Sequence, residues 1–203
     1  NDWTDSTLKE VLNNGAYYNR TSGTCPYDSG GITTSCDFTS NGLTEDAKNQ
    51  IDTVTWSLGG TDNYMDTNTI QFYTYERGTT VYSGRPTEWQ GKVGLIYPSD
   101  YGYATSGGST TNRSSCLNKE LYNWASSPDL DCPKNDWLYM SRSYQWTLAV
   151  DSSYSDGVFN VSTGSVSAGT VYHQYEVRPS VYLIPSTSIL SGDGSQTNPY
   201  TIG

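Results

Sequence analysis

The feature that most constrains the fold of this chain is its set of four cysteines, which form two local pairs. Cys25 precedes Cys36 and Cys116 precedes Cys132, and each pair encloses a loop rich in Gly, Ser, Asn, Asp or Pro. Because such loops bury few apolar side chains, a cross-link would stabilise them by roughly 3 kcal/mol, mainly by restricting the unfolded chain. We therefore predict two disulfides, Cys25–Cys36 and Cys116–Cys132.

A metal site is the competing interpretation of these cysteines. Structural zinc needs closely spaced cysteines and usually histidines, whereas the chain has no Cys-x-x-Cys pair and a single histidine, His173. We expect no metal and no other cofactor. Disulfides, few lysines and many Ser, Thr and Tyr residues together indicate an extracellular or cell-surface protein.

Length and charge limit the domain organisation and the classes of binding partner. A chain of 203 residues without a long linker or a fixed repeat predicts one domain over 1–203. With 13% aromatic residues it has the rings that an ordered core needs. The net charge of -10 would repel phosphate groups, so binding to nucleic acid or to an anionic membrane surface is disfavoured.

Hydrophobic patterning predicts helices first and strands later. A helix is expected within 4–15, where Leu8, Val11 and Leu12 share a face and Gly15 ends the run, and another after Thr44. This order favours an α+β domain with two main helices on a twisted antiparallel sheet. A strand that contains a proline should lie at a sheet edge or carry a bulge, and we expect this of the strand that contains Pro179. A short helix is predicted at 118–124, and strands at 70–75, 92–97, 136–140, 145–150, 157–161, 165–168 and 177–184.

Five segments in a fixed order resemble one group of bacterial proteins. They are Trp3–Lys9 with Leu12 and Asn13; 43–51 with Trp56; 91–97 with 99–103; 177–183; and 192–195 with 198–202. This pattern resembles bacterial surface domains related to the C-type-lectin-like fold, in the branch that also contains the formylglycine-generating enzyme and the variable proteins of diversity-generating retroelements. The resemblance implies a C-type-lectin-like domain with irregular loops. The family places strands before the opening helix, so we expect that these strands or an anchor lie upstream of Asn1, or that another segment replaces them.

The sequence gives little support for catalysis or for calcium-dependent sugar binding. No Ser or Cys lies beside His173 in a motif, and the formylglycine-generating relatives depend on reactive cysteines, whereas these four are assigned to disulfides. The Glu-Pro-Asn and Gln-Pro-Asp triplets of calcium-binding lectins are absent. A tight turn is the preferred interpretation of Gly192–Ser195. We expect no enzymatic activity.

The remaining interpretation is a binding surface without a cofactor. Tyr, Ser, Gly and Asn are the residues that antibody loops favour, because rings give contact area at low entropic cost. In the retroelement relatives the displayed surface precedes the final strand, which corresponds here to 137–175. Alternate positions of a meander must face the core, so about half of the candidates are expected to face solvent. The candidate ligand-binding residues are Tyr139, Arg142, Tyr144, Trp146, Tyr154, Tyr172, His173 and Tyr175.

Two functions follow as hypotheses. The first is a bacterial extracellular or cell-surface domain for adhesion, which binds a protein or glycan ligand outside the cell. The alternative is the globular head of a pilin-like filament subunit, which would contact copies of itself and follow an anchoring helix upstream of Asn1. Neither hypothesis includes nucleic acid as a partner or direct membrane contact by this segment.

Overall fold

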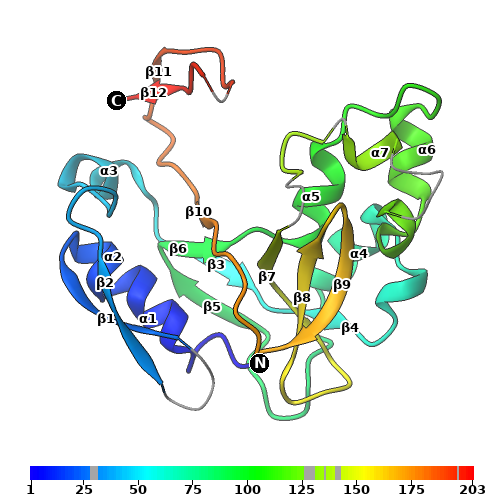
Figure 1. The fold of residues 1–203 in the computed structure, drawn as a ribbon, viewed down its shortest axis with the longest axis horizontal. Helices are drawn as coiled ribbons and strands as arrows, with labels where there is room; N and C mark the ends of the chain where they lie inside the picture. Colours follow the sequence, from blue (N-terminus) through cyan, green and yellow to red (C-terminus); the bar gives the residue numbers. More distant parts are fainter. Residues whose placement is uncertain (28–31, 126–130, 135, 140–142, 196) are drawn as a thin grey trace.

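The computed structural model describes residues 1–27, 32–125, 131–134, 136–139, 143–195 and 197–203. Within these residues the chain combines short helices with small sheets, so the α+β class is confirmed (Figure 1). The helices are α1 (Thr7–Asn13), α2 (Ala16–Asn19), α3 (Glu45–Gln50), α4 (Thr69–Glu76), α5 (Pro98–Ala104), α6 (Arg113–Asn118) and α7 (Asp131–Lys134), with 3-10 turns η1 (Tyr64–Asp66) and η2 (Leu121–Ala125). The strands are β1 (Ser22–Pro26), β2 (Thr33–Asp37), β3 (Val54–Ser57), β4 (Gly60–Thr61), β5 (Glu88–Gly91), β6 (Val93–Leu95), β7 (Tyr144–Asp151), β8 (Gly157–Ser162), β9 (Ser165–Thr170), β10 (Pro179–Val181), β11 (Ile189–Ser191) and β12 (Thr201–Ile202).

The largest sheet has the strand order β4-β7-β8-β9. Strands β7, β8 and β9 form the antiparallel meander predicted at 145–150, 157–161 and 165–168. The short strand β4 adds a parallel pair to β7, which the antiparallel prediction did not include. Helix α5 packs against β7 and β8, and α4 packs against α5 (Figure 1). Helices α4 and α5 therefore cover part of this sheet, whereas the sequence predicted that the helices within 4–15 and after Thr44 would do so.

Side-chain caps begin the two helices that the sequence predicted near the N-terminus. The Ser6 hydroxyl accepts a hydrogen bond from the Lys9 backbone N–H at α1, and the Thr44 hydroxyl accepts one from the Ala47 N–H at α3. At the other end of α1, the Asn13 amide donates to the backbone oxygen of Val93 and accepts from its N–H. This pair of bonds fixes α1 to β6.

The strand predicted at 70–75 is wrong, because this segment is helix α4. Its aromatic and β-branched residues favour a strand locally, but Asn68 and Gln71 form a capping box that begins a helix. Phe72 and Glu76, four residues apart, are both fully buried on one face. Burial at helical spacing outweighs the local preference for a strand.

Other predicted elements also differ from the structure, among them the strand at 92–97, of which β6 covers only Val93–Leu95. Residues 136–139 form no strand, and Met140 lies outside the described residues. The helix expected at 118–124 is divided into α6, which ends at Asn118, and the 3-10 turn η2. Of 177–184 only β10 is a strand, and it pairs with β6 in a two-stranded sheet, so Pro179 lies at an edge as predicted.

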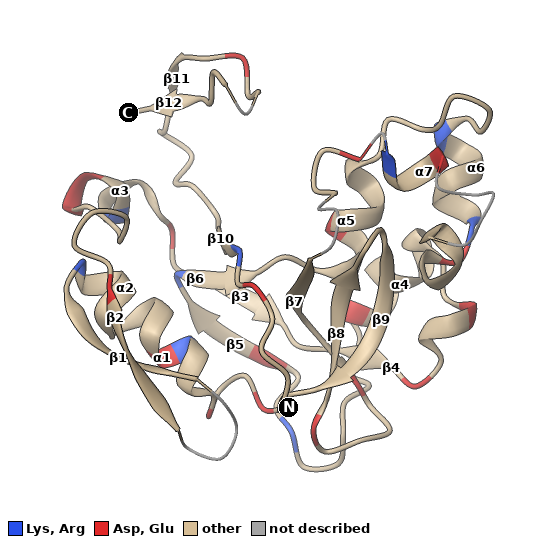
Figure 2. Cartoon of the chain, in the orientation of Figure 1, with Lys and Arg blue, Asp and Glu red and all other residues tan. Residues whose placement is uncertain are grey.

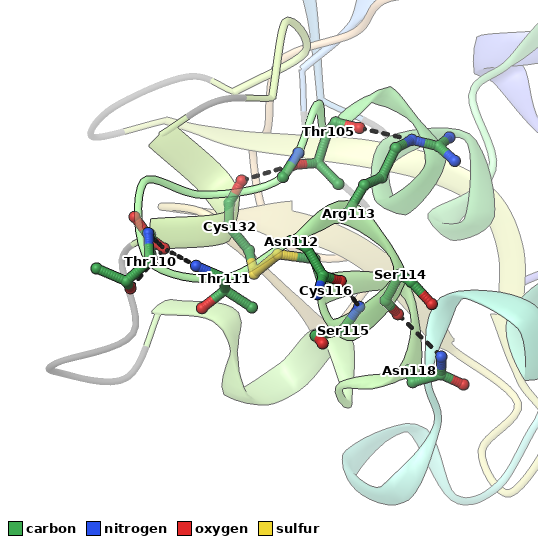
Figure 3. Close-up of a disulfide and its surroundings, with 12 residues drawn as sticks. Thr105, Thr110, Thr111, Asn112, Arg113, Ser114, Ser115, Cys116, Asn118 and Cys132 are labelled. Atoms are coloured by element: carbon green, nitrogen blue, oxygen red, sulfur yellow. Dashed lines mark hydrogen bonds between the residues drawn. A yellow bond between two sulfur atoms is a disulfide. The ribbon is translucent and has the colours of Figure 1, made fainter.

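Both predicted disulfides are present. Cys25–Cys36 links the neighbouring strands β1 and β2, whereas Cys116–Cys132 links α6 to α7 inside the core (Figure 3). That core is one continuous cluster of buried side chains. It contains Trp3 near the N-terminus and the fully buried rings of Phe72, Tyr101, Trp124 and Phe159. None of the helices in the described ranges has the length and apolar character that crossing a bilayer requires.

Candidate functional site

A cleft of about 670 Å³ lies between the N-terminal segment and β7. One wall consists of residues 1–3 and 5–8, which lead into α1, and the end of β1 contributes Pro26 and the neighbouring Tyr27. The opposite wall combines β7 with the segment 171–175 and Val177, after β9. This volume is within the usual range of ligand-binding pockets, which is roughly 300–1,000 Å³.

Alternation along β7 places Trp146 at the cleft and Tyr144 on the same strand face, outside the cleft lining. Tyr144 is exposed and Trp146 half-buried, whereas Gln145 between them is buried. Farther along the strand, Leu148 and Val150 form the apolar floor of the cleft. The sequence of β7 therefore places Gln145 in the interior and one ring and two aliphatic side chains at the cleft.

Backbone hydrogen bonds hold the second wall against β7. The Glu176 N–H donates to the Tyr144 oxygen over 2.8 Å, and the Trp146 N–H donates to the Glu176 oxygen over 3.1 Å. Before this contact the chain turns through a bond from the His173 N–H to the Thr170 oxygen. These bonds explain why residues from β7 and from a segment almost thirty positions later meet in one place.

Three rings surround Tyr175 as a result. Its ring centroid lies 4.9 Å from that of Tyr144, 4.4 Å from that of Trp146 and 5.3 Å from that of His173. The planes of Tyr175 and His173 are parallel within 6°. Partial burial of the phenol raises the pKa of Tyr175 above its ordinary value, so it stays a neutral ring. We call Tyr144, Trp146, His173 and Tyr175 the aromatic cluster.

Acidic residues lie on the N-terminal wall. Asp2 accepts hydrogen bonds from the Thr4 N–H and hydroxyl, and its other oxygen lies 3.5 Å from the Arg85 guanidinium. Desolvation acts to raise the pKa of Asp2, but these hydrogen bonds and the Arg85 charge outweigh it and hold that pKa below its ordinary value. Asp5 is exposed on the same wall. The wall therefore carries negative charge at neutral pH.

The structure brings together five of the eight candidate residues from the sequence. The aromatic cluster contains four of them, and Tyr172, with 58% of its surface exposed, lines the cleft next to the cluster. Tyr154 is exposed in the turn between β7 and β8, outside the cleft lining. Tyr139 is half-buried near Gly164, and Arg142 lies outside the described residues.

The sequence interpretation missed the whole N-terminal wall. Asp2 and Asp5 flank Trp3 at the start of the chain, about 140 positions before the aromatic cluster. Contacts at that distance, such as the Asn1 amide donating to the Gly157 oxygen, leave no local pattern. The one available signal was two acidic residues around a tryptophan before a capped helix.

Burial also lowers the pKa of the amino group of Asn1, which lines the cleft, but the remaining ionisable groups with displaced pKa values do not line it. Burial raises the pKa of Glu76 to about 7 and that of Asp136 to about 7, but both carboxyl groups lie inside the fold. Within the described ranges, no three His, Cys, Asp or Glu side chains are grouped so that they could hold a metal ion. The cleft therefore offers ring faces, two carboxylates and small polar groups as its binding chemistry.

Comparisons of this chain with protein-family models, with curated proteins and with solved structures found no match.

Proposed function

We propose that this chain is a bacterial extracellular or cell-surface domain of the C-type-lectin-like fold, which binds a protein or glycan ligand in the cleft and catalyses no reaction. The aromatic cluster carries this proposal, because Trp146, His173 and Tyr175 line a cleft of ligand size and Tyr144 stacks on Tyr175 beside it. Tyr144 and His173 are exposed. Exposed rings that neighbours hold in place lose little entropy on binding. The two disulfides support an extracellular location.

The first prediction tests the cleft as the ligand site. Glycan and peptide arrays probed with the purified chain should show binding that is the same in calcium and in chelator. Tyr172→Ala should weaken this binding about tenfold, because an exposed ring in a cleft supplies contact area without holding the fold together. Tyr154→Ala removes an equally exposed ring outside the cleft and is the matched control.

Thermal unfolding of both variants should match the wild-type protein, since exposed substitutions change stability by at most about 0.5 kcal/mol. The proposal fails if no array ligand binds, or if Tyr154→Ala and Tyr172→Ala weaken binding equally.

The second candidate function is the globular head of a pilin-like filament subunit, and one observation favours it. The hairpin of β11 and β12 projects from the body of the protein beyond α3 (Figure 1). It exposes Ile189, Leu190 and Tyr200, with 63%, 66% and 53% of their surfaces accessible. Neighbouring large apolar side chains on one exposed hairpin are typical of a contact surface.

A filament subunit should associate through this hairpin. We expect sedimentation of the chain to show concentration-dependent self-association that Leu190→Glu abolishes, because a charge would then have to be buried in the contact. Thr197→Glu changes a polar residue of the same hairpin region and should leave association intact. A chain that stays monomeric at high concentration would exclude this candidate function.

A further inference from the structure

The charged side chains in the lining of the cleft are all acidic. Its lining contains the carboxylates of Asp2 and Asp5, and no Lys or Arg among the residues that the structure describes there. Arg85 reaches Asp2 from outside this lining, and the amino group of Asn1 donates to the backbone oxygen of Ser155. Figure 2 shows acidic segments beside the N-terminus with one basic segment next to them. A cationic ligand would be attracted to this cleft and an anionic one repelled.

Ring faces add a second attraction for the same kind of ligand. Tyr172 and His173 are exposed and line the same cleft as Asp2 and Asp5. The face of a tyrosine ring attracts a cation, and the planar guanidinium of arginine also stacks on it. Such a group could contact Tyr172 while it pairs with a carboxylate of the facing wall. Neutral sugars would gain from the rings but not from the charge.

The size of the cleft favours a protein segment over a small amine as its ligand. A volume of about 670 Å³ holds several side chains, more than one guanidinium or ammonium group fills. The exposed apolar side chains of Tyr27, Val171 and Val177, which also line the cleft, would remain in water beside a small amine. A peptide can place one basic side chain in the cleft and apolar neighbours against these exposed side chains.

We propose that the ligand of this cleft is a basic protein segment that inserts an arginine or lysine side chain between Tyr172 and Asp5. This inference rests on the proposed function and specifies its ligand class. The net charge of -10 would also speed the encounter with such a partner at low ionic strength.

The test uses a short Gly/Ser peptide with several arginines and the same peptide with citrulline in their place. Citrulline keeps the shape of arginine and removes its charge, so we expect binding to the intact chain to weaken at least about tenfold. Asp5→Asn should weaken binding of the arginine peptide about fivefold. Asp66→Asn, which removes the same charge from an exposed site outside the cleft, should change it less than about twofold.

The outcomes separate this inference from the proposed function. Loss of arginine-peptide binding in Asp5→Asn and in Tyr172→Ala, but not in Asp66→Asn, supports both. If the arginine peptide does not bind while a glycan or an acidic peptide binds and Tyr172→Ala weakens it, the ligand class is wrong and the cleft remains the binding site. Equal binding of the arginine and citrulline peptides would also overturn the ligand class.

Discussion

Replacing Cys116 and Cys132 with alanine is expected to destabilise the protein by about 5 kcal/mol, compared with about 3 kcal/mol for the same change at Cys25 and Cys36. The two bonds close loops of similar length, with sequence separations of 16 and 11, so their effects on the unfolded chain should be similar. The difference in destabilisation between the two double variants should therefore come from the folded state.

The surroundings of the two disulfides explain this difference. Cys116 and Cys132 are 0% and 2% exposed and belong to the main core, so alanine at both positions would leave a void. The Thr105 hydroxyl donates to the Cys132 backbone oxygen over 2.8 Å, which ties this bond to the end of α5 (Figure 3). Cys25–Cys36 joins two strands that already pair along their length and are largely exposed.

Urea unfolding of the two double variants and the wild-type protein, in the same buffer, would measure both free energies. The midpoint should fall further for the Cys116/Cys132 variant, with little change in the slope. An equal or larger loss in the Cys25/Cys36 variant would show that the bond inside the core contributes only through the unfolded chain.

Local signals were sufficient for part of this fold. The disulfide pairing followed from cysteine spacing, and the starts of α1 and α3 followed from Ser6 and Thr44, whose caps act within three residues. The meander of β7, β8 and β9 followed from short runs of strand-forming residues between turns. These features depend on neighbours along the chain, so the sequence alone could indicate them.

Features that depend on distant contacts were not predictable in this way. Helix α4 depends on a core in which Phe72 and Glu76 are both buried. No local sequence pattern predicts a fully buried carboxyl group. In the candidate site, Tyr144 and Trp146 could be placed on one strand face by alternation. Their contact with Tyr175 depends on the bridge between β7 and the Glu176 backbone, which local patterns do not specify.

Glu76 should make the protein less stable as the pH rises from mildly acidic to neutral. Its side chain is fully buried at the end of α4, and it accepts hydrogen bonds from the Ser99 N–H over 2.8 Å and from the Ser99 hydroxyl. The Arg77 guanidinium lies 3.1 Å from one oxygen. Burial nevertheless outweighs these contacts and raises the pKa of Glu76 from 4.5 to about 7.

The direction of the effect follows from proton binding. Between pH 4.5 and about 7 the folded protein retains a proton that the unfolded chain has released, so the free energy of unfolding falls as the pH rises. A pKa difference of this size corresponds to roughly 3 kcal/mol, fully lost above neutral pH. Glu76→Gln keeps the shape and the acceptor for the Ser99 N–H but has no such proton to lose.

Urea unfolding at about pH 5 and about pH 8 would measure this contribution. Relative to the wild-type protein, Glu76→Gln should gain roughly 3 kcal/mol between the two pH values. Comparison at each pH removes the effect of Asp136, because both proteins contain it and burial raises its pKa to about 7 as well. Glu88→Gln makes the same chemical change at an exposed strand position. Its free energy of unfolding should change with pH as that of the wild-type protein does. If Glu76→Gln also runs parallel to it, the carboxyl group is ionised in the folded protein throughout this range, and its bonds to Ser99 and Arg77 compensate for burial.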